Sequence, residues 1–427
     1  MPLYGPDFAA DPQAYYSYLR QYGPAAPVEL APGVEATLVT DYQAALRVLQ
    51  DPASFRKDAR RWRALNEGAL PPDSPVVPVL SYRPNCMFSD GAEHLRLRQA
   101  ITDTMTRVDA RRVARSTEQA SNFLIAQFGP HGSVDLGDYA KQLSLLVFNE
   151  LFGCPADIGD RVLFGASGMF DGTNAEQAIG VLFQACGELV MLKRNQPADD
   201  ITSWLLQHDA KLTDEEMVYQ LALLLVAGTE PLRNLIGNTL HRLLTDDAYA
   251  HNGGLIDEAI DHTLWENPPM ANLAPHYPAT DMEFAGQQLR AGDLVLVSFA
   301  AANTSPELGA ARQAGSRAHL AWSAGPHACP SKEPARQIAV TAIENLLNRL
   351  PDVELAVPED GLEWRPGPFS RGLASLPAHF TPVQPARRPA AQAPHPAPSA
   401  RADQSPQGGA KPERGGRWSQ FLAWLQG

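Results

Sequence analysis

Apolar residues recur with helical spacing over most of the chain between residues 94 and 244. The strongest stretch runs from Met217 to Leu244, and its middle, residues 221–227, is apolar on every side. A soluble helix of this kind lies at the centre of a large protein. The sequence Thr213-Asp-Glu-Glu216 precedes the stretch and is typical of a capping box, so it predicts where this long helix begins.

Shorter patterns surround this helical region. Residues 36–40 and 294–299 are typical of strands, whereas residues 42–50 and 332–350 are typical of helices. We therefore expect a mainly α-helical fold with small β-sheets. Residues 1–382 show no composition break and are predicted to form one domain.

The last 45 residues, 383–427, differ from this body: seven are proline, six are Lys or Arg and two are Asp or Glu. Such a composition predicts a disordered tail. The tail ends in a short amphipathic segment, residues 417–425, whose aromatic and leucine side chains share one helical face. Two alternatives stay open for this segment: it recruits a protein partner or a membrane surface, or it packs back on its own body.

The composition excludes several classes of protein. The formal net charge of −13 excludes a general role in binding nucleic acid. There is no apolar run of the roughly 20 residues that a membrane span needs, and the first residues lack the features of a signal peptide. Four cysteines lie far apart, which argues against a zinc knuckle or a disulfide framework. We therefore expect a cytoplasmic protein.

One of the cysteines lies in the most informative stretch of the chain, Trp322-Ser-Ala-Gly-Pro-His-Ala-Cys329. The stretch is a Gly/Pro-rich turn, and the helix predicted from Lys332 follows it directly. A thiolate close to a helix N-terminus is favoured by backbone N–H groups and by the helix dipole. Cys329 is therefore a candidate metal ligand, and thiolate is one of the protein ligands used for haem iron. The alternative is a buried structural cysteine.

The order and spacing of this stretch resemble the haem-ligand loop of cytochrome P450 enzymes, Phe-Gly-x-Gly-x-His-x-Cys-x-Gly-x-x-Leu-Ala-Arg. The resemblance extends over roughly residues 5–382 and implies haem b as cofactor, with Cys329 as its axial ligand. The residues that match the loop are Trp322, Gly325, His327, Cys329, Ala335 and Arg336, and those that depart from it are Ser323, Ser331 and Pro334.

Four basic residues correspond to positions that bind the haem propionates in the family. His94 and Arg98 lie one helical turn apart in a segment similar to the family's Asp-Pro-Pro-Glu-His-Thr-Arg-Leu-Arg. His276 and His327 fall where the family has an Arg and a His or Arg. We expect the four to form a clamp for carboxylates. Taken singly, each of the histidines is more often a satisfied polar residue than a ligand contact, and the His94–Arg98 segment alone is typical of a solvated charged face.

The stretch Ala227-Gly-Thr-Glu230 resembles the Ala-Gly-x-(Asp/Glu)-Thr motif on the long helix that crosses above the haem. In the family, the acid and the threonine after it pass protons to bound oxygen. Glu230, with the neighbouring Thr229, is the candidate for this role. The threonine position is Pro231, which has no hydroxyl and is expected to kink the helix. The alternative for Glu230 is an ion pair, for example with Arg233.

The family's Glu-x-x-Arg motif is missing. At the corresponding position the chain has His262-Thr-Leu-Trp265, as in an actinobacterial subset of the family that has lost the motif. Apolar packing of Trp265 can replace a buried ion pair when both partners change together. A shifted ion pair through Glu258 or Asp261 is the alternative.

The resemblance implies a monooxygenase that acts on a small organic substrate, with electrons from a ferredoxin and a ferredoxin reductase. The departures at Pro231, in the Cys329 loop and at the Glu-x-x-Arg position favour the alternative, which is a catalytically impaired haem-binding or docking protein of the same fold.

Overall fold

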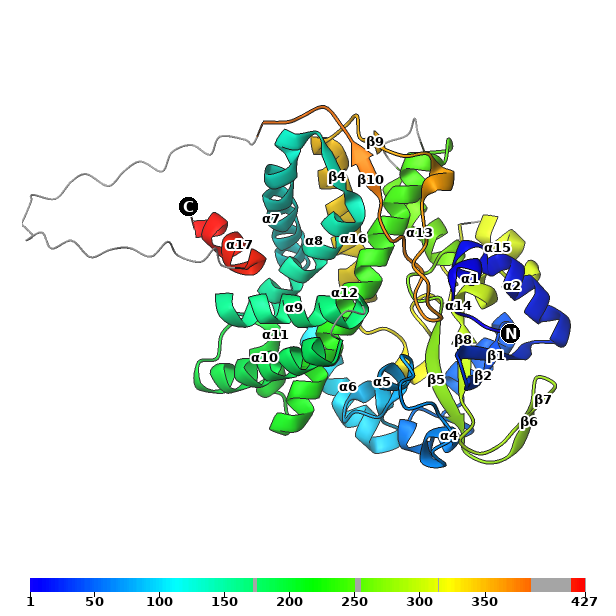
Figure 1. The fold of residues 1–427 in the computed structure, drawn as a ribbon. Helices are drawn as coiled ribbons and strands as arrows, with labels where there is room; N and C mark the ends of the chain where they lie inside the picture. Colours follow the sequence, from blue (N-terminus) through cyan, green and yellow to red (C-terminus); the bar gives the residue numbers. More distant parts are fainter. Residues whose placement is uncertain (172–174, 250–254, 314, 385–415, 427) are drawn as a thin grey trace, which may run out of the picture.

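The computed structural model describes residues 1–171, 175–249, 255–313, 315–384 and 416–426. Its centre is α12 (Asp214–Thr245), a helix of 32 residues that crosses the molecule between a helical layer and a part built on β-sheets (Figure 1). The predicted capping box is present: the Glu216 amide donates to the Thr213 hydroxyl at 3.2 Å, and the Thr213 amide donates to the Glu216 carboxylate at 2.9 Å. The long central helix and its predicted start are therefore confirmed, although its middle, residues 221–227, is not buried on every side.

Further helices surround α12 and bury its apolar sides. Helices α8, α10, α13 and α16 pack against it, and α9 packs against α10. Their bounds are α6 (Gly91–Thr106), α7 (Ala110–Phe128), α8 (Leu136–Leu151), α9 (Ala156–Asp171), α10 (Ala175–Asn195), α11 (Ile201–Leu206), α13 (Ile256–Glu266) and α16 (Lys332–Arg349).

The largest sheet has the strand order β1-β2-β8-β5-β3, and a second cluster of buried apolar side chains packs against it. Strand β2 runs parallel to β8, whereas the other neighbouring pairs are antiparallel. The strands predicted at residues 36–40 and 294–299 correspond to β2 and β8, but Thr40 and Leu294 lie just outside these strands and Phe299 begins a helix. The five strands are β1 (Ala25–Ala31), β2 (Val34–Val39), β3 (Phe55–Arg56), β5 (Asn272–Pro278) and β8 (Val295–Ser298).

Smaller elements complete the fold. A three-stranded sheet joins β4 (Ser133–Asp135), β10 (Pro377–His379) and β9 (Glu354–Leu355), and a hairpin pairs β6 (Met282–Phe284) with β7 (Gln287–Leu289). The short helices are α1 (Pro6–Ala10), α2 (Pro12–Leu19), α3 (Tyr42–Gln50), α4 (Arg63–Asn66), α5 (Val77–Leu80), α14 (Phe299–Asn303) and α15 (Gly309–Gln313). The mainly α-helical fold with small sheets is confirmed.

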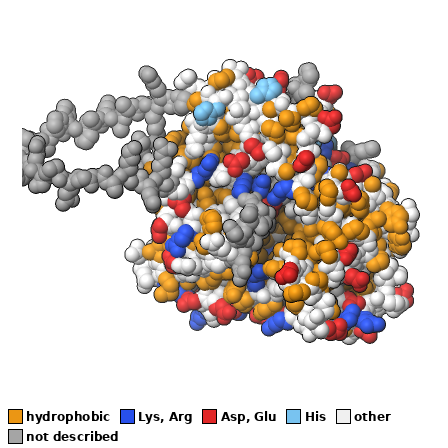
Figure 2. Space-filling view, in the orientation of Figure 1, with side chains coloured by type: hydrophobic (Ala, Val, Ile, Leu, Met, Phe, Trp, Pro, Cys, Tyr) orange, Lys and Arg blue, Asp and Glu red, His pale blue; other side chains and the backbone are white. Residues whose placement is uncertain are grey.

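Within the described residues, none of the helices has the length and apolar character needed to span a membrane. On the face shown in Figure 2, acidic and basic side chains are scattered among hydrophobic ones. The charges on this face are thus interspersed and do not form one large field of a single sign.

The amphipathic C-terminal segment forms a helix, α17 (Arg417–Gln426), and its apolar face packs on α7, α8 and α9. Trp418 and Phe421 are fully buried there. The Trp418 indole donates to the carbonyl of Cys154 at 3.1 Å, and Asp160 accepts the Trp418 amide at 2.8 Å. A Cβ atom on Gly159 would lie 2.1 Å from the indole, so glycine is needed at this position. The packed position is the second of the two alternatives; residues 385–415, where most of the tail was predicted to be disordered, lie outside the described residues.

We expect Trp418→Ala to release α17 from the body. Truncating a buried tryptophan costs about 3–5 kcal/mol, and a ten-residue helix has little stability of its own in water. Hydrogen exchange followed by mass spectrometry checks this: the α17 amides should lose their protection in Trp418→Ala and keep it in Gln426→Ala, because Gln426 is exposed. Equal protection in both variants would contradict the docking.

Candidate functional site

Cys329 lies at the end of a tightly folded loop that begins at Trp322. The Cys329 amide donates to the Trp322 carbonyl at 2.8 Å and closes the loop. Gly325 has a φ of +69°, and a Cβ atom there would lie 2.1 Å from the carbonyl oxygen of Leu49 in α3. Only glycine fits this contact. Ser323 also has a positive φ, 61°, at a position where the family pattern has glycine.

The surroundings of the Cys329 thiol combine burial with positive charge. Burial raises the pKa of the thiol, while the Ser331 amide, Arg98 and Lys332 act to lower it. The effect of burial on the pKa is larger than the effect of the nearby helix N-terminus, so the thiol in the protein alone does not ionise readily. A bound metal cation would supply the missing positive charge. The other three cysteines are free and buried, whereas Cys329 is partly exposed.

His94 and Arg98, both on α6, point to the Cys329 loop. The rings of His94 and His327 lie 3.9 Å apart between centroids. An Arg98 guanidinium nitrogen donates to the carbonyl of Ala328, next to Cys329. His94 is buried, and its Nε2 atom has no hydrogen-bond partner. Two of the predicted residues are thus attached directly to the loop that carries the thiol.

His276 reaches the same place from β5. It is buried, and its Nδ1 lies 2.7 Å from the carbonyl of Ala274, which assigns the proton to Nδ1. Lys57, a residue that the sequence analysis missed, joins it: its Nζ donates to the carbonyl of Pro275 at 2.8 Å. Lys57 lies in a charged run that looks exposed in the sequence, but the sheet covers it, and burial lowers its pKa to about 7.

These five basic side chains, which we call the basic cluster, form one group. Burial lowers the pKa of His327, and so do, in order, Lys57, His94, His276 and Arg98. Asp90 is an acidic group that acts on this cluster, and its carboxylate already accepts the backbone amides of Lys57 and Asp58. The five basic side chains surround a place where Asp90 is already engaged by backbone amides, so the arrangement favours an anionic ligand beside Cys329.

The middle turns of α12 have one open side. Ala227 is exposed although the helix around it is packed, and Leu223 and Pro231, one turn before and after it, are partly exposed. The helix continues through Pro231 without a break. Thr229 lies on a buried side of the helix, where its hydroxyl donates to the Leu225 carbonyl at 2.6 Å. The open side of this stretch is therefore apolar.

Glu230 belongs to a polar stripe that fastens α12 to the C-terminal part of the chain. Its buried carboxylate pairs with Arg365 and, at 3.7 Å, with Arg233, which is the ion pair that the sequence analysis considered. The Asn234 amide donates to the same carboxylate at 3.2 Å. One turn later, the Asn238 amide donates to the carbonyl of residue 371 at 2.9 Å. Glu230 thus has a structural function, whatever else it does.

Comparison with known proteins decides the family. No protein-family model matches the sequence. Over 400 residues the chain is 33% identical to the cytochrome P450 monooxygenase PikC of Streptomyces venezuelae, a match that covers 88% of this chain and 92% of that protein. The chain belongs to the cytochrome P450 family. Two solved P450 structures resemble it. CYP154C4 of Streptomyces sp. ATCC 11861 is 28% identical with a TM-score of 0.80, and the match covers 89% of this chain and 98% of that one. CYP154A1 of Streptomyces coelicolor is 29% identical with a TM-score of 0.74, and the match covers 87% of this chain and 98% of that one.

Family membership confirms the resemblance found in the sequence. Relatives of this P450 are haem-binding monooxygenases, which places the chain in that general class of oxidoreductases. Cytochrome P450 107B1 of Saccharopolyspora erythraea, 30% identical over 390 residues, is another such relative.

His262 and Trp265, both on α13, make contacts with other parts of the chain. Trp265 is buried on α13, donates from its indole to the Ser316 carbonyl at 2.7 Å, and meets the His319 ring edge to face at 5.6 Å. His262 pairs through Nδ1 with the Tyr249 hydroxyl. Trp265 is therefore packed, as expected, and its partners Ser316 and His319 lie in the segment before the Cys329 loop.

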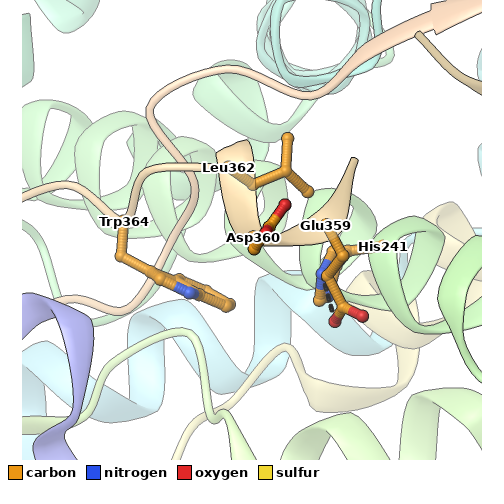
Figure 3. Close-up of a pocket in the computed structure, with 5 residues that line it drawn as sticks. All are labelled: His241, Glu359, Asp360, Leu362 and Trp364. Carbon is orange, nitrogen blue, oxygen red and sulfur yellow. Dashed lines mark ion pairs between the residues drawn. The ribbon is translucent and has the colours of Figure 1, made fainter. Parts of the chain in front are cut away.

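A surface cavity of about 530 Å³ lies elsewhere, at the C-terminal half of α12 (Figure 3). Trp364, Leu362 and Asp360 surround it, and His241 pairs with Glu359 at 3.3 Å on its wall. Arg371 stacks over the Trp364 ring at 3.5 Å. The cavity shares no residue with the basic cluster.

Proposed function

We propose that this P450 is a haem-thiolate monooxygenase in which Cys329 is the axial ligand of haem b. The observation that carries the proposal is the basic cluster, with the unpartnered Nε2 of His94, beside the partly exposed thiol. A flat metal complex with two carboxylates needs both features at the same place. The remaining cysteines are buried, which supports a haem held without covalent attachment.

The protein groups divide into two tasks. Arg98 holds the backbone of the Cys329 loop through one guanidinium nitrogen, and its other N–H groups, with His94, His327 and Lys57, offer donors to the propionates. His276 already uses its Nδ1 proton on Ala274 and donates from Nε2 only when it is also protonated, which a bound carboxylate favours. The haem, when bound, supplies the oxygen chemistry, in which a thiolate ligand favours cleavage of the O–O bond.

We expect the basic cluster to set the rate of haem loss. Hydrogen bonds to charged groups are worth about 1.5–3 kcal/mol, and 1.4 kcal/mol is a factor of ten. Transfer of haem to an apo-acceptor should therefore be roughly tenfold or more faster in Arg98→Ala, His327→Ala and Lys57→Met. Gln99→Ala is the matched control because Gln99 is exposed on the same helix. Parental haem retention in all three variants would refute the cluster's assignment.

Glu230 and Thr229 are the candidates for moving protons. For either to do so, a present contact must open: the Glu230 ion pair with Arg365, or the Thr229 hydrogen bond to Leu225. Pro231 has no proton to offer. Proton delivery from α12 is therefore less prepared than in the family pattern.

We further propose that electrons come from a ferredoxin and its reductase and enter near the start of α16. A groove of about 480 Å³ lies there, with apolar Met105, Val108 and Val340 beside charged Glu333 and Arg336. The helix that lines the groove begins directly after the Cys329 loop, which keeps the electron path short. Val108→Asp should slow reduction by the ferredoxin without changing the spectrum of the haem.

The second candidate, a catalytically impaired haem protein, is favoured by Pro231 and by the occupied side chains of Thr229 and Glu230. One experiment separates the two. The haem-loaded protein is supplied with ferredoxin, reductase, NADPH and ¹⁸O₂ over a panel of small organic compounds. A monooxygenase transfers one labelled atom to a product; release of all electrons as hydrogen peroxide over the whole panel would support the impaired protein instead.

A further inference from the structure

The loop that carries Cys329 is fastened to α13 on both sides. Arg317 precedes the loop, and its Nε donates to one carboxylate oxygen of Asp261 at 2.9 Å. Arg336 follows the loop on α16, and its Nη1 donates to the other oxygen of Asp261 at 2.5 Å. One carboxylate therefore joins the segments before and after the thiol.

The geometry points to Asp261 as the positioning residue for the Cys329 loop, a role that rests on the proposed haem-thiolate function. Its carboxylate supplies the ionic part of the connection that the missing Glu-x-x-Arg leaves open. Trp265, one turn later on the same helix, adds ring packing on His319 and a hydrogen bond to the Ser316 carbonyl. Of the two acidic residues considered in the sequence, Glu258 is exposed, and Asp261 makes the contacts.

The two ion pairs of Asp261 differ in how far water reaches them. The side chains of Asp261 and Arg336 are 15% and 14% exposed, whereas that of Arg317 is 62% exposed. Water screens the Arg317 pair, so most of the restraint acts through Arg336. Asp257 also pairs with Arg336, at 2.7 Å, but its side chain is 64% exposed and does not reach the segment before the loop. Asp257 is therefore a matched control on the same helix.

The first test compares Asp261→Asn with Asp257→Asn in the haem-loaded protein. Groups that orient a metal ligand typically change affinity 10- to 100-fold when they are removed, so Asp261→Asn should lose haem at least roughly tenfold faster. Part of its reduced carbon monoxide complex should also change to the spectrum of a neutral thiol ligand. Asp257→Asn should stay within about twofold of the parent, and Asp261→Glu should restore part of the thiolate spectrum. Equal behaviour of the two asparagine variants would overturn the inference.

The second test needs no haem and separates this inference from the proposed function. Hydrogen exchange of the haem-free protein reports on the amides of Ser323, Ala328 and Cys329, whose hydrogen bonds hold the loop. These amides should exchange faster in Asp261→Asn and in Arg336→Gln. The double variant should exchange no faster than either single variant, because both substitutions break the same Asp261–Arg336 contact. Arg317→Gln should produce a smaller increase in exchange, because the Arg317 side chain is exposed. It serves as the test if the other variants do not fold. Unchanged exchange in all variants would show that Asp261 does not position the loop, even if the protein binds haem as proposed.

Discussion

Replacing Trp265 by alanine is expected to lower the free energy of unfolding by about 3–5 kcal/mol, the range for truncating a large buried aromatic side chain. The indole is buried between α13 and the segment before the Cys329 loop. Its removal leaves a cavity and also leaves the Ser316 carbonyl without its donor. Chemical denaturation followed by circular dichroism measures the loss.

Two further variants separate packing from hydrogen bonding at this position. Trp265→Phe keeps most of the volume and should cost only the hydrogen bond, about 1–3 kcal/mol. The double change His262→Glu with Trp265→Arg, which introduces the Glu and Arg of the family motif, should destabilise the protein because a guanidinium replaces a buried indole. If Trp265→Ala unfolds at the parental denaturant concentration, Trp265 does not make this connection.

Glu230→Ala is expected to be about as costly, roughly 3–5 kcal/mol, because it removes the buried carboxylate that Arg365 shares with Arg233. Both arginine side chains are largely shielded from water, and the Glu230 carboxylate is buried. The loss should appear in the same denaturation experiment, whether or not haem is bound. A purely catalytic Glu230 would instead affect turnover and leave stability unchanged.

Glu215→Ala is the control for Glu230 because Glu215 is an exposed acid on the same helix; it should cost no more than about 1 kcal/mol, the value of an acid in the first turn. Combining Glu230→Ala with Arg365→Met should recover part of the loss, since the unpaired charge is then removed. Additive losses in the double variant would contradict the ion pair.

Local signals predicted much of the fold. The apolar stretch before Leu244 and the capping box at Thr213 gave the central helix because both depend on neighbours in the sequence. The positions of His94, Arg98, His276 and His327 were inferred from the family pattern, and in the structure they gather beside Cys329. Their role toward the haem stays a prediction.

Contacts between distant residues were harder to foresee. Lys57 meets Pro275 only because β3 pairs with β5, and Glu230 meets Arg365 only because the C-terminal segment returns to α12. From the sequence, Glu258 and Asp261 were both candidates for a shifted ion pair. Deciding between them requires the positions of Arg317 and Arg336 in the structure. Likewise, the sequence shows the aromatic face of α17 but does not show that Gly159 allows the Trp418 indole to pack closely against α9.

The central claim is that Cys329 binds haem iron as a thiolate, and the absorption spectrum of the reduced carbon monoxide complex tests it most directly. The parent and Cys86→Ala, which removes a buried cysteine, should both show the red-shifted Soret band of thiolate ligation. Cys329→Ala should lack that band while remaining folded. A Cys329→Ala protein with the parental spectrum would contradict the account.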